Sequence, residues 1–277
     1  MQGEKTAVVC LGSAMRSVYS AGFLFALGSR LKVAPDFLVA ASGSAGSACY
    51  FASGQYDSGK HIWTKLLSTR RFISLLRVWK IMDIDYLVDD VFKKQDPLDI
   101  ARLQASSTDV LVSVTNTETG LPEFMSVRSG ASPFELLRAT KAHPIFYHRA
   151  VALRGHAYVD GAFGLSPQIL LNYAVSLGAT RILFINDMPS KYEWFARLLR
   201  ASAAVAPGRL KKILGHYPLT IIKPTAPGSV QMVYVQPEKL PSTRTTRSSR
   251  LLTKTFDIGV ADALALTKEL RNLFTTV

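Results

Sequence analysis

Two polar residues, Ser44 and Asp160, have the chemistry and the sequence context of an acyl-transfer pair. Ser44 lies in the small-residue segment 42–46, which follows the apolar run 37–40 and leads into a small-residue helix. This order predicts a strand-turn-helix elbow that presents one hydroxyl at the positive end of a helix. Asp160 follows the predicted strand 156–159 and precedes a glycine. We therefore predict Ser44 as a nucleophile and Asp160 as its base, although either segment alone also fits a plain turn.

An acyl-transfer site also needs hydrogen-bond donors where the carbonyl oxygen becomes negatively charged. The loop 12–17 follows a predicted buried strand over residues 7–11, and the backbone N–H groups after Gly12 are placed to serve as those donors. The same loop also fits a strand-to-helix crossing that binds nothing, or a degenerate phosphate loop. It lacks the lysine and most of the glycines of a nucleotide site.

These three loops require a parallel sheet, whose carboxyl-end loops meet at one edge. Apolar runs predict strands at 7–11, 37–40, 110–114, 123–127, 156–159, 181–185, 220–222 and 232–235. Helices are expected at about 18–31, 132–142, 166–177, 192–214 and 258–274, and residues 56–105 are expected to be helical and basic.

The chain contains no repeat and no clear linker, so we expect a single domain over residues 1–277. Within it we expect a basic helical excursion at about 192–217 and a closing helix at about 258–274. The cysteines, Cys10 and Cys49, lie in apolar runs and fit core packing.

The net charge predicts an anionic partner, since the chain contains 33 Lys and Arg but only 20 Asp and Glu. Basic and apolar residues alternate over 194–200, which favours a lipid surface over nucleic acid; a solvated amphipathic helix fits this segment equally well. No stretch is apolar and long enough for a membrane span, and no secretory segment is evident. We expect a cytoplasmic protein that binds peripherally at the inner membrane surface.

Several of these segments together resemble the patatin-like phospholipase family. Residues 12–17 and 22–27 are similar to its oxyanion loop, Gly-Gly-Gly-x-Arg-Gly, and to the Gly-x-Leu-x-Ala-Leu helix that follows. Residues 42–46 resemble its Gly-x-Ser-x-Gly elbow, and residues 160–162 its Asp-Gly-Gly/Ala motif. Segments 114–120, 138–144 and 259–263 extend the likeness over nearly the whole chain.

The resemblance implies a three-layer α/β/α fold with a mostly parallel central sheet and a Ser-Asp dyad that hydrolyses lipid acyl esters, as phospholipases A, lysophospholipases and esterases do. Ser44 would attack the carbonyl and Asp160 would take its proton. The main-chain N–H groups of Gly12, Ser13 and Ala14 would form the oxyanion hole. Arg16 would order that loop or bind phosphate. No cofactor and no metal are implied. None of the histidines is at a motif position, although His143 and His156 lie near the motifs.

The chain departs from the family pattern where Ser13, Ala14, Ser17 and Ser42 replace glycines. A non-glycine residue at positive φ costs roughly 1–2 kcal/mol, so these changes bear on the activity. The alternative is a weakened relative that binds anionic lipid without efficient turnover. A third hypothesis is an acyl-carrier transacylase, which would pair the elbow serine with a histidine.

Overall fold

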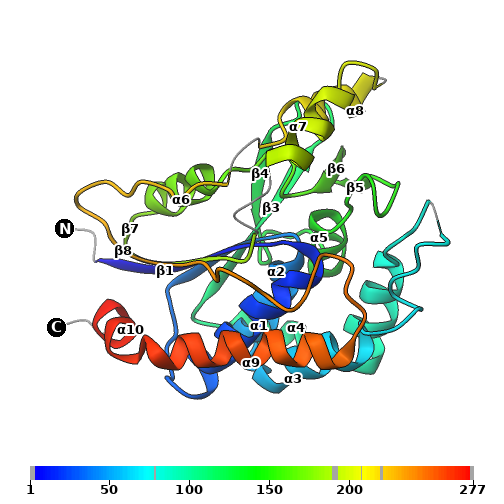
Figure 1. The fold of residues 1–277 in the computed structure, drawn as a ribbon. Helices are drawn as coiled ribbons and strands as arrows, with labels where there is room; N and C mark the ends of the chain where they lie inside the picture. Colours follow the sequence, from blue (N-terminus) through cyan, green and yellow to red (C-terminus); the bar gives the residue numbers. More distant parts are fainter. Residues whose placement is uncertain (1–3, 78, 189–192, 207, 219–220, 275–277) are drawn as a thin grey trace.

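The centre of the molecule is an eight-stranded sheet with helices on both faces (Figure 1). The computed structural model describes residues 4–77, 79–188, 193–206, 208–218 and 221–274, with the backbone alone for 193–196. The sheet order is β5-β6-β3-β2-β1-β7-β8, and β4 pairs with β3 outside this path. The strands are β1 (Lys5–Leu11), β2 (Phe37–Ala41), β3 (Asp109–Asn116), β4 (Pro122–Ser126), β5 (Val151–Leu153), β6 (His156–Asp160), β7 (Ala179–Asn186) and β8 (Gln231–Val235).

The pairings β1 with β2, β2 with β3, β1 with β7 and β7 with β8 are parallel, while β4, β5 and β6 run antiparallel to their neighbours. Successive residues of β1 face opposite sides, so that Val8 and Cys10 belong to one core and Val9 and Leu11 to the other. A sheet that is buried on both faces needs helices on both, which explains the continuous apolar strands.

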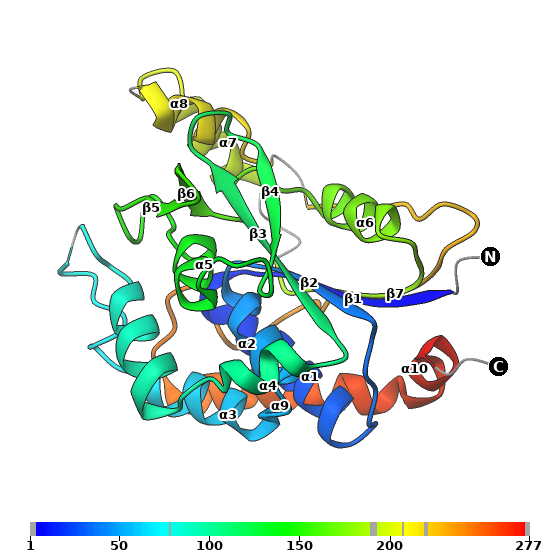
Figure 2. The ribbon, with the colours of Figure 1, turned by 180° about the vertical axis from the view of Figure 1, so that it is seen from behind.

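One face of the sheet is covered by α1 (Val18–Ser29), α2 (Gly43–Ala52), α3 (Tyr56–His61), α4 (Ile100–Ala105) and α9 (Ser249–Ala265). The opposite face carries α6 (Pro167–Ser176), with α7 (Glu193–Ser202) and α8 (Gly208–Gly215) at the end where β3 and β4 project (Figures 1 and 2). Helix α5 (Pro133–Thr140) lies beside β5 and β6, and α10 (Thr267–Phe274) ends the described chain. The predicted α/β/α fold class with a mostly parallel central sheet is confirmed.

Helix α9 begins earlier than the predicted residue 258, because the Ser248 hydroxyl accepts the Leu251 N–H and caps it. Its close contact with α1 depends on two glycines. A Cβ on Gly22 would lie 2.0 Å from the Phe256 carbonyl oxygen, and a Cβ on Gly259 would lie 2.2 Å from that of Tyr19. These glycines let the backbones of α1 and α9 pack in direct contact, and this contact fixes the position of α1 against α9.

Three other elements differ from the sequence prediction. The segment 56–105, predicted to be helical with a break at Asp96-Pro97, is interrupted more widely. π-Helical turns occupy Ile62–Leu66 and Tyr86–Gln95, and the described residues between 68 and 82 form turns and an isolated bridge from Ile73 to Met82. Ile221 and Ile222 lie outside any strand, and Thr220 lies outside the described residues. Strand β5 was not predicted; its three residues are too short to give a periodic signal.

The basic segment at 192–217 forms α7 and α8, which pack Leu199, Ile213 and Leu214 into the core above the sheet. Leu198 and Val205 are exposed. The side chains of Trp194 and Phe195, which carried the lipid-surface prediction, lie outside the described residues.

Candidate active site

Ser42, and not Ser44, is the apex of the elbow. It lies between the end of β2 and the start of α2, with φ 49° and ψ −121°. A non-glycine residue there costs of order 1–3 kcal/mol and persists only where the surroundings impose it, as in a nucleophile elbow. The Ser42 hydroxyl donates to Asp160 Oδ2 at 2.7 Å.

Ser44 already belongs to the first turn of α2, and its side chain points into the interior. It is fully buried, and its Oγ contacts Asp187 Oδ2 at 3.4 Å. The predicted Ser44–Asp160 pair is therefore wrong as a contact. The structure forms the pair two residues earlier, because β2 continues to Ala41 and the helix begins at Gly43.

Asp160 ends β6, which is antiparallel to β3 and brings the carboxylate to the elbow. Its Oδ1 accepts the Ala162 N–H at 2.9 Å, and its Oδ2 accepts the Ser42 hydroxyl. Burial raises the pKa of Asp160 to about 6, although these hydrogen bonds and the charges of Lys141 and Arg244 act to lower it. The predicted loop around Asp160 does meet the elbow.

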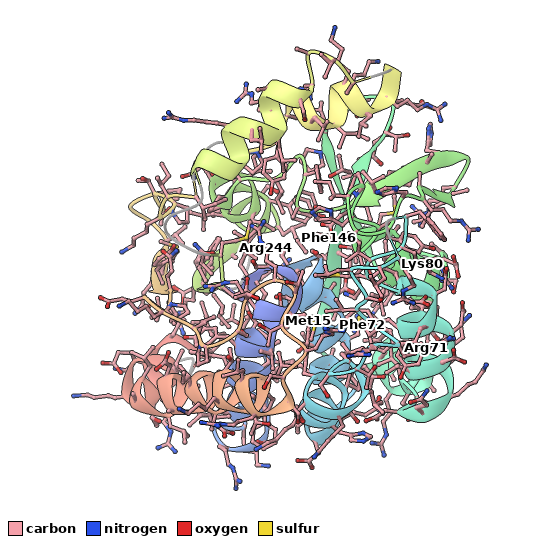
Figure 3. All side chains as sticks on the ribbon, turned by 45° about the vertical axis from the view of Figure 1, so that its right-hand side comes forward. Met15, Arg71, Phe72, Lys80, Phe146 and Arg244 are labelled. Atoms are coloured by element: carbon pink, nitrogen blue, oxygen red, sulfur yellow. The ribbon has the colours of Figure 1, made fainter. Side chains whose placement is uncertain are left out.

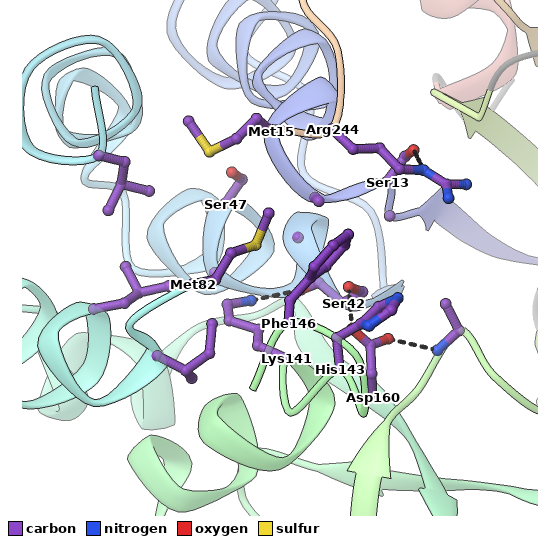
Figure 4. A pocket seen from close by; sticks show the side chains of 18 of the residues that line it. Ser13, Met15, Ser42, Ser47, Met82, Lys141, His143, Phe146, Asp160 and Arg244 are labelled. Carbon is purple, nitrogen blue, oxygen red and sulfur yellow. Dashed lines mark hydrogen bonds between the residues drawn. The ribbon is translucent and has the colours of Figure 1, made fainter. Parts of the chain in front are cut away.

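The end of α5 joins the elbow to the Asp160 loop. Thr140 Oγ1 accepts the Ser42 N–H at 2.9 Å, and the Thr140 carbonyl accepts the Gly161 N–H at 3.2 Å. Lys141 Nζ donates to the Ser42 carbonyl at 2.5 Å (Figure 4). Burial lowers the pKa of Lys141 to about 8. Sequence reasoning missed Lys141, since a lysine at a helix end is usually solvated and carries no signal of its own.

The loop 12–17, which we call the oxyanion loop after its predicted role, lies against the elbow. A Cβ on Gly12 would lie 2.1 Å from the Ala41 carbonyl oxygen, so only glycine fits there. The Ser13 N–H is donated to Ser17 Oγ at 2.8 Å. Within the described part of the chain, no acceptor is found for the N–H groups of Ala14 and Gly43.

The N–H groups of Ala14 and Gly43, together with that of the predicted donor Gly12, are therefore candidates to meet a carbonyl oxygen at Ser42, since these residues line the cavity beside it. Ala14 has φ 49°, the left-handed conformation that a glycine would adopt without strain. Gly43 was missed because it follows Ser42 rather than the predicted Ser44; the residue after the nucleophile is a usual donor. Of the three predicted donors, Ser13 has its N–H already engaged.

Arg16 braces the loop from behind. Its Nε donates to the Asp187 carbonyl at 2.8 Å, and one terminal nitrogen donates to the Ser242 carbonyl at 3.4 Å. The side chain is buried and does not line the cavity. Of the two predicted roles, this geometry favours loop ordering over phosphate binding.

A cavity opens from Ser42 into the space beside α2, with about 870 Å³ of empty volume including its open end. Its polar end holds the oxyanion loop, Ser42, Lys141 and Asp160. Most of the remaining lining is apolar and includes Met15, Tyr50, Ile62, Trp63, Leu67, Phe72, Met82, Ile84, Leu87, Phe92, Phe146, Ala162, Phe163, Met188 and Tyr217. Gly43, Gly46, Ser47 and Tyr50 share one face of α2, and the small residues of its first turns leave room along the helix. Such an apolar lining suits an apolar ligand.

Among the described residues, neither histidine near the motifs forms a hydrogen bond with Ser42 or Asp160. His143 lines the cavity, stacks on Phe146 and accepts the Ile145 N–H at Nδ1. Burial, assisted by the charge of Arg244, lowers the pKa of His143 to about 3, so the ring is neutral. His156 is exposed at the opposite end of β6. Among the described residues, no group of three or more His, Cys, Asp or Glu side chains could hold a metal.

Comparisons with known proteins agree with this geometry. Residues 8–171 match the family model of the patatin-like phospholipases, and this range contains the oxyanion loop, Ser42 and Asp160. The uncharacterized protein YjjU of Escherichia coli (strain K12) is 27% identical over 210 residues, which are 72% of this chain and 57% of YjjU. The chain thus spans little more than half the length of this relative. The crystal structure of VipD from Legionella pneumophila is similar in fold, with a TM-score of 0.50 and 12% identity over 95% of this chain and 67% of VipD.

Proposed function

Since the chain belongs to the patatin-like phospholipase family, we propose that it hydrolyses lipid acyl esters with Ser42 as nucleophile and Asp160 as base. The observation that carries the proposal is the 2.7 Å contact from Ser42 Oγ to Asp160 Oδ2 at a strained strand-to-helix turn. The family supports acyl-ester hydrolysis; the assignment of these two residues is our own.

The contacts suggest a two-step reaction. Asp160 takes the Ser42 proton as Oγ attacks the ester carbonyl, and the N–H groups of Ala14 and Gly43 stabilise the oxyanion. Asp160 then gives that proton to the leaving alcohol, which leaves an acyl group on Ser42. A water molecule, deprotonated by Asp160, attacks the acyl group, and Asp160 returns this proton to Ser42 Oγ as the fatty acid is released. Throughout, Lys141 and Thr140 hold the Ser42 backbone in place.

Two alternatives have less support. A lipid binder without turnover would not need the strained Ser42 backbone, nor a carboxylate buried against its hydroxyl. A transacylase that pairs the serine with a histidine needs a ring in contact with Ser42, whereas the hydroxyl donates to Asp160. The family assignment agrees with hydrolysis.

A fluorophosphonate probe tests the proposal directly. We expect one adduct, mapped by mass spectrometry to Ser42, together with release of free fatty acid from a phospholipid. An intact, folded protein that takes up no probe and releases no fatty acid would refute the hydrolase proposal. An adduct on Ser44 would refute the residue assignment alone.

The pH dependence should report Asp160. Because its pKa is raised to about 6 and the reaction needs the carboxylate, kcat/KM should fall below that pH and level off above it. Lys141 places a positive charge that lowers the pKa of Asp160, so Lys141→Met should move the acidic limb to higher pH. Profiles of both proteins with one soluble ester give the measurement. An unmoved limb would mean that Lys141 acts only through the Ser42 carbonyl.

The acyl-chain cavity predicts a change in chain-length preference. A Cβ on Gly46 would lie 3.0 Å from the Phe92 ring, so the larger side chain of Gly46→Leu should fill the passage beside α2. We expect hydrolysis of long-chain esters to fall roughly 10-fold or more, and of short-chain esters to change little. The short-chain ester is the internal control for folding. An equal loss on both esters would contradict an acyl site along this helix.

We also propose that the protein acts at a lipid surface. The segment between the cavity residues Phe72 and Met82 exposes Leu75, Leu76 and Trp79, with exposed fractions of 65%, 92% and 67%. Arg71 lies on the same side of the molecule (Figure 3), and the chain carries a net charge of +13. No described helix is long and apolar enough to cross a membrane.

Exposed apolar side chains beside cations are typical of peripheral membrane binding. The double variant Leu76→Ser, Trp79→Ser should therefore bind vesicles containing anionic lipid several-fold more weakly in co-sedimentation. Its hydrolysis of a soluble ester should be unchanged, because neither side chain lines the cavity. Undiminished vesicle binding would place the lipid contact elsewhere.

A further inference from the structure

Arg244 reaches the catalytic cavity from the segment that precedes α9, outside the residues 8–171 that match the family. Its Nε lies 3.5 Å from Ser13 Oγ, and a terminal nitrogen lies 3.7 Å from Met188 Sδ. Its carbonyl accepts the Met15 N–H at 3.3 Å. The backbone contact anchors the residue to the oxyanion loop, and the side chain lies over that loop.

The cavity has two sides about Ser42. Figure 4 shows Met82 and other apolar side chains on one side of the serine, and Ser13 and Arg244 on the other. An ester held at Ser42 with its acyl chain along α2 has its alcohol part toward Ser13 and Arg244. These two side chains thus face the part of the substrate that leaves first.

The charges around Ser42 favour an anion. Lys141 donates to the Ser42 carbonyl, and Arg16 donates to backbone carbonyls behind the loop. Arg244 adds a further positive charge near the site and lines its wall. Its charge is close enough to lower the pKa values of both His143 and Asp160. Asp160 is the one carboxylate among the described residues that line the cavity, and it already accepts the Ser42 hydroxyl hydrogen. These residues therefore offer no acidic partner for a substrate with an ammonium group.

We propose that Arg244, assisted by the Ser13 hydroxyl, binds a phosphate on the alcohol part of the substrate and selects anionic over neutral acyl esters. A guanidinium and a hydroxyl supply directed donors of the kind that phosphate prefers. The inference rests on the hydrolase function proposed above and assigns its substrate specificity to a residue outside the family-matched region.

The test compares Arg244→Gln with the unchanged protein on two substrates of the same acyl chain, lysophosphatidylglycerol and monoacylglycerol, below their micelle concentrations. We expect KM for the anionic substrate to rise roughly 10- to 100-fold, as for loss of a charged hydrogen bond. KM and kcat for the neutral ester should change little. Arg250→Gln, at an exposed position in the first turn of α9, is the matched control for the net charge and should change neither.

Each other outcome contradicts the proposal. Equal loss of kcat on both substrates would assign Arg244 to the oxyanion instead of the phosphate. Equal loss together with a lower melting temperature would make it a structural brace of the loop. Unchanged kinetics on both substrates would show that Arg244 does not bind the substrate. If the unchanged protein hydrolyses neither substrate and takes up no fluorophosphonate, the hydrolase function itself fails, which is a separate result.

Discussion

Ser42→Ala should abolish ester hydrolysis and fluorophosphonate labelling, whereas Ser44→Ala should retain both. Removal of a nucleophile from a catalytic serine site costs on the order of 10⁶-fold in kcat, so we expect a loss of roughly 10⁴-fold or more even with a slow substrate. Ser42 Oγ donates to the buried carboxylate Asp160, while Ser44 Oγ faces Asp187 behind the elbow. Steady-state hydrolysis of one soluble ester, with intact-mass labelling, measures the difference.

The comparison of the two variants is informative because the two serines lie two residues apart and contact different carboxylates. Ser44→Ala removes only a long contact of 3.4 Å, so its melting temperature should fall slightly and its activity should stay within a few-fold. Ser42→Ala relieves no backbone strain, since alanine at φ 49° is as strained as serine, and it should fold like the original. Activity that survives in Ser42→Ala and disappears in Ser44→Ala would restore the assignment made from the sequence alone.

The proposed nucleophile lies two residues before the predicted one, and this difference shows what the sequence could not decide. Residues 42–46 contain two serines with small neighbours, and only the end of β2 determines which of them occupies the turn. Gly43 and Gly46 suggested an elbow centred on Ser44. In the structure Gly43 follows the apex, where we propose that its N–H binds the oxyanion, and Gly46 lies against Phe92 in the wall of the cavity.

The sheet and the meeting of its three loops were predictable because they follow from local patterns. Apolar runs interrupted by Gly or Asp-Gly identified β1, β2 and β6, and parallel pairing brings the ends of β1 and β2 to one edge. Asp160 reaches the same edge differently from the prediction, because β6 pairs antiparallel with β3. Lys141 and Arg244 were not predictable in their roles, because each acts on a residue about a hundred or more positions away. Their contacts exist only once α5 and the segment before α9 have packed on the sheet.

Asp160→Asn should lower kcat/KM by roughly 10³- to 10⁴-fold and leave the fold intact. The amide oxygen can replace Oδ1 and accept the Ala162 N–H, while the amide NH2 replaces Oδ2 and donates to Ser42 Oγ, so the elbow geometry is kept. It cannot take up the proton as Ser42 attacks; an acid-to-amide change in a serine triad has a comparable cost. Residual activity should also lose the acidic limb near pH 6. Retention of activity within 10-fold would exclude Asp160 as the base.

The stability of Asp160→Asn distinguishes loss of the base from misfolding. We expect this variant to be more stable than the original protein, whereas a misfolded variant would be less stable. The pKa of Asp160 rises from 3.8 in the unfolded reference to about 6 in the folded protein, so the folded state binds the proton more tightly. Unfolding free energy therefore decreases as the pH rises from about 4 to above 6, because the buried carboxylate must ionise.

The neutral amide of Asp160→Asn carries no such cost. The melting temperature of this variant, relative to the original protein, should accordingly increase with pH across this window and stay at its highest above it. A variant that is inactive and less stable at pH 8 than at pH 5, relative to the original, would show that the carboxylate stabilises the fold and that its loss of activity says nothing about catalysis.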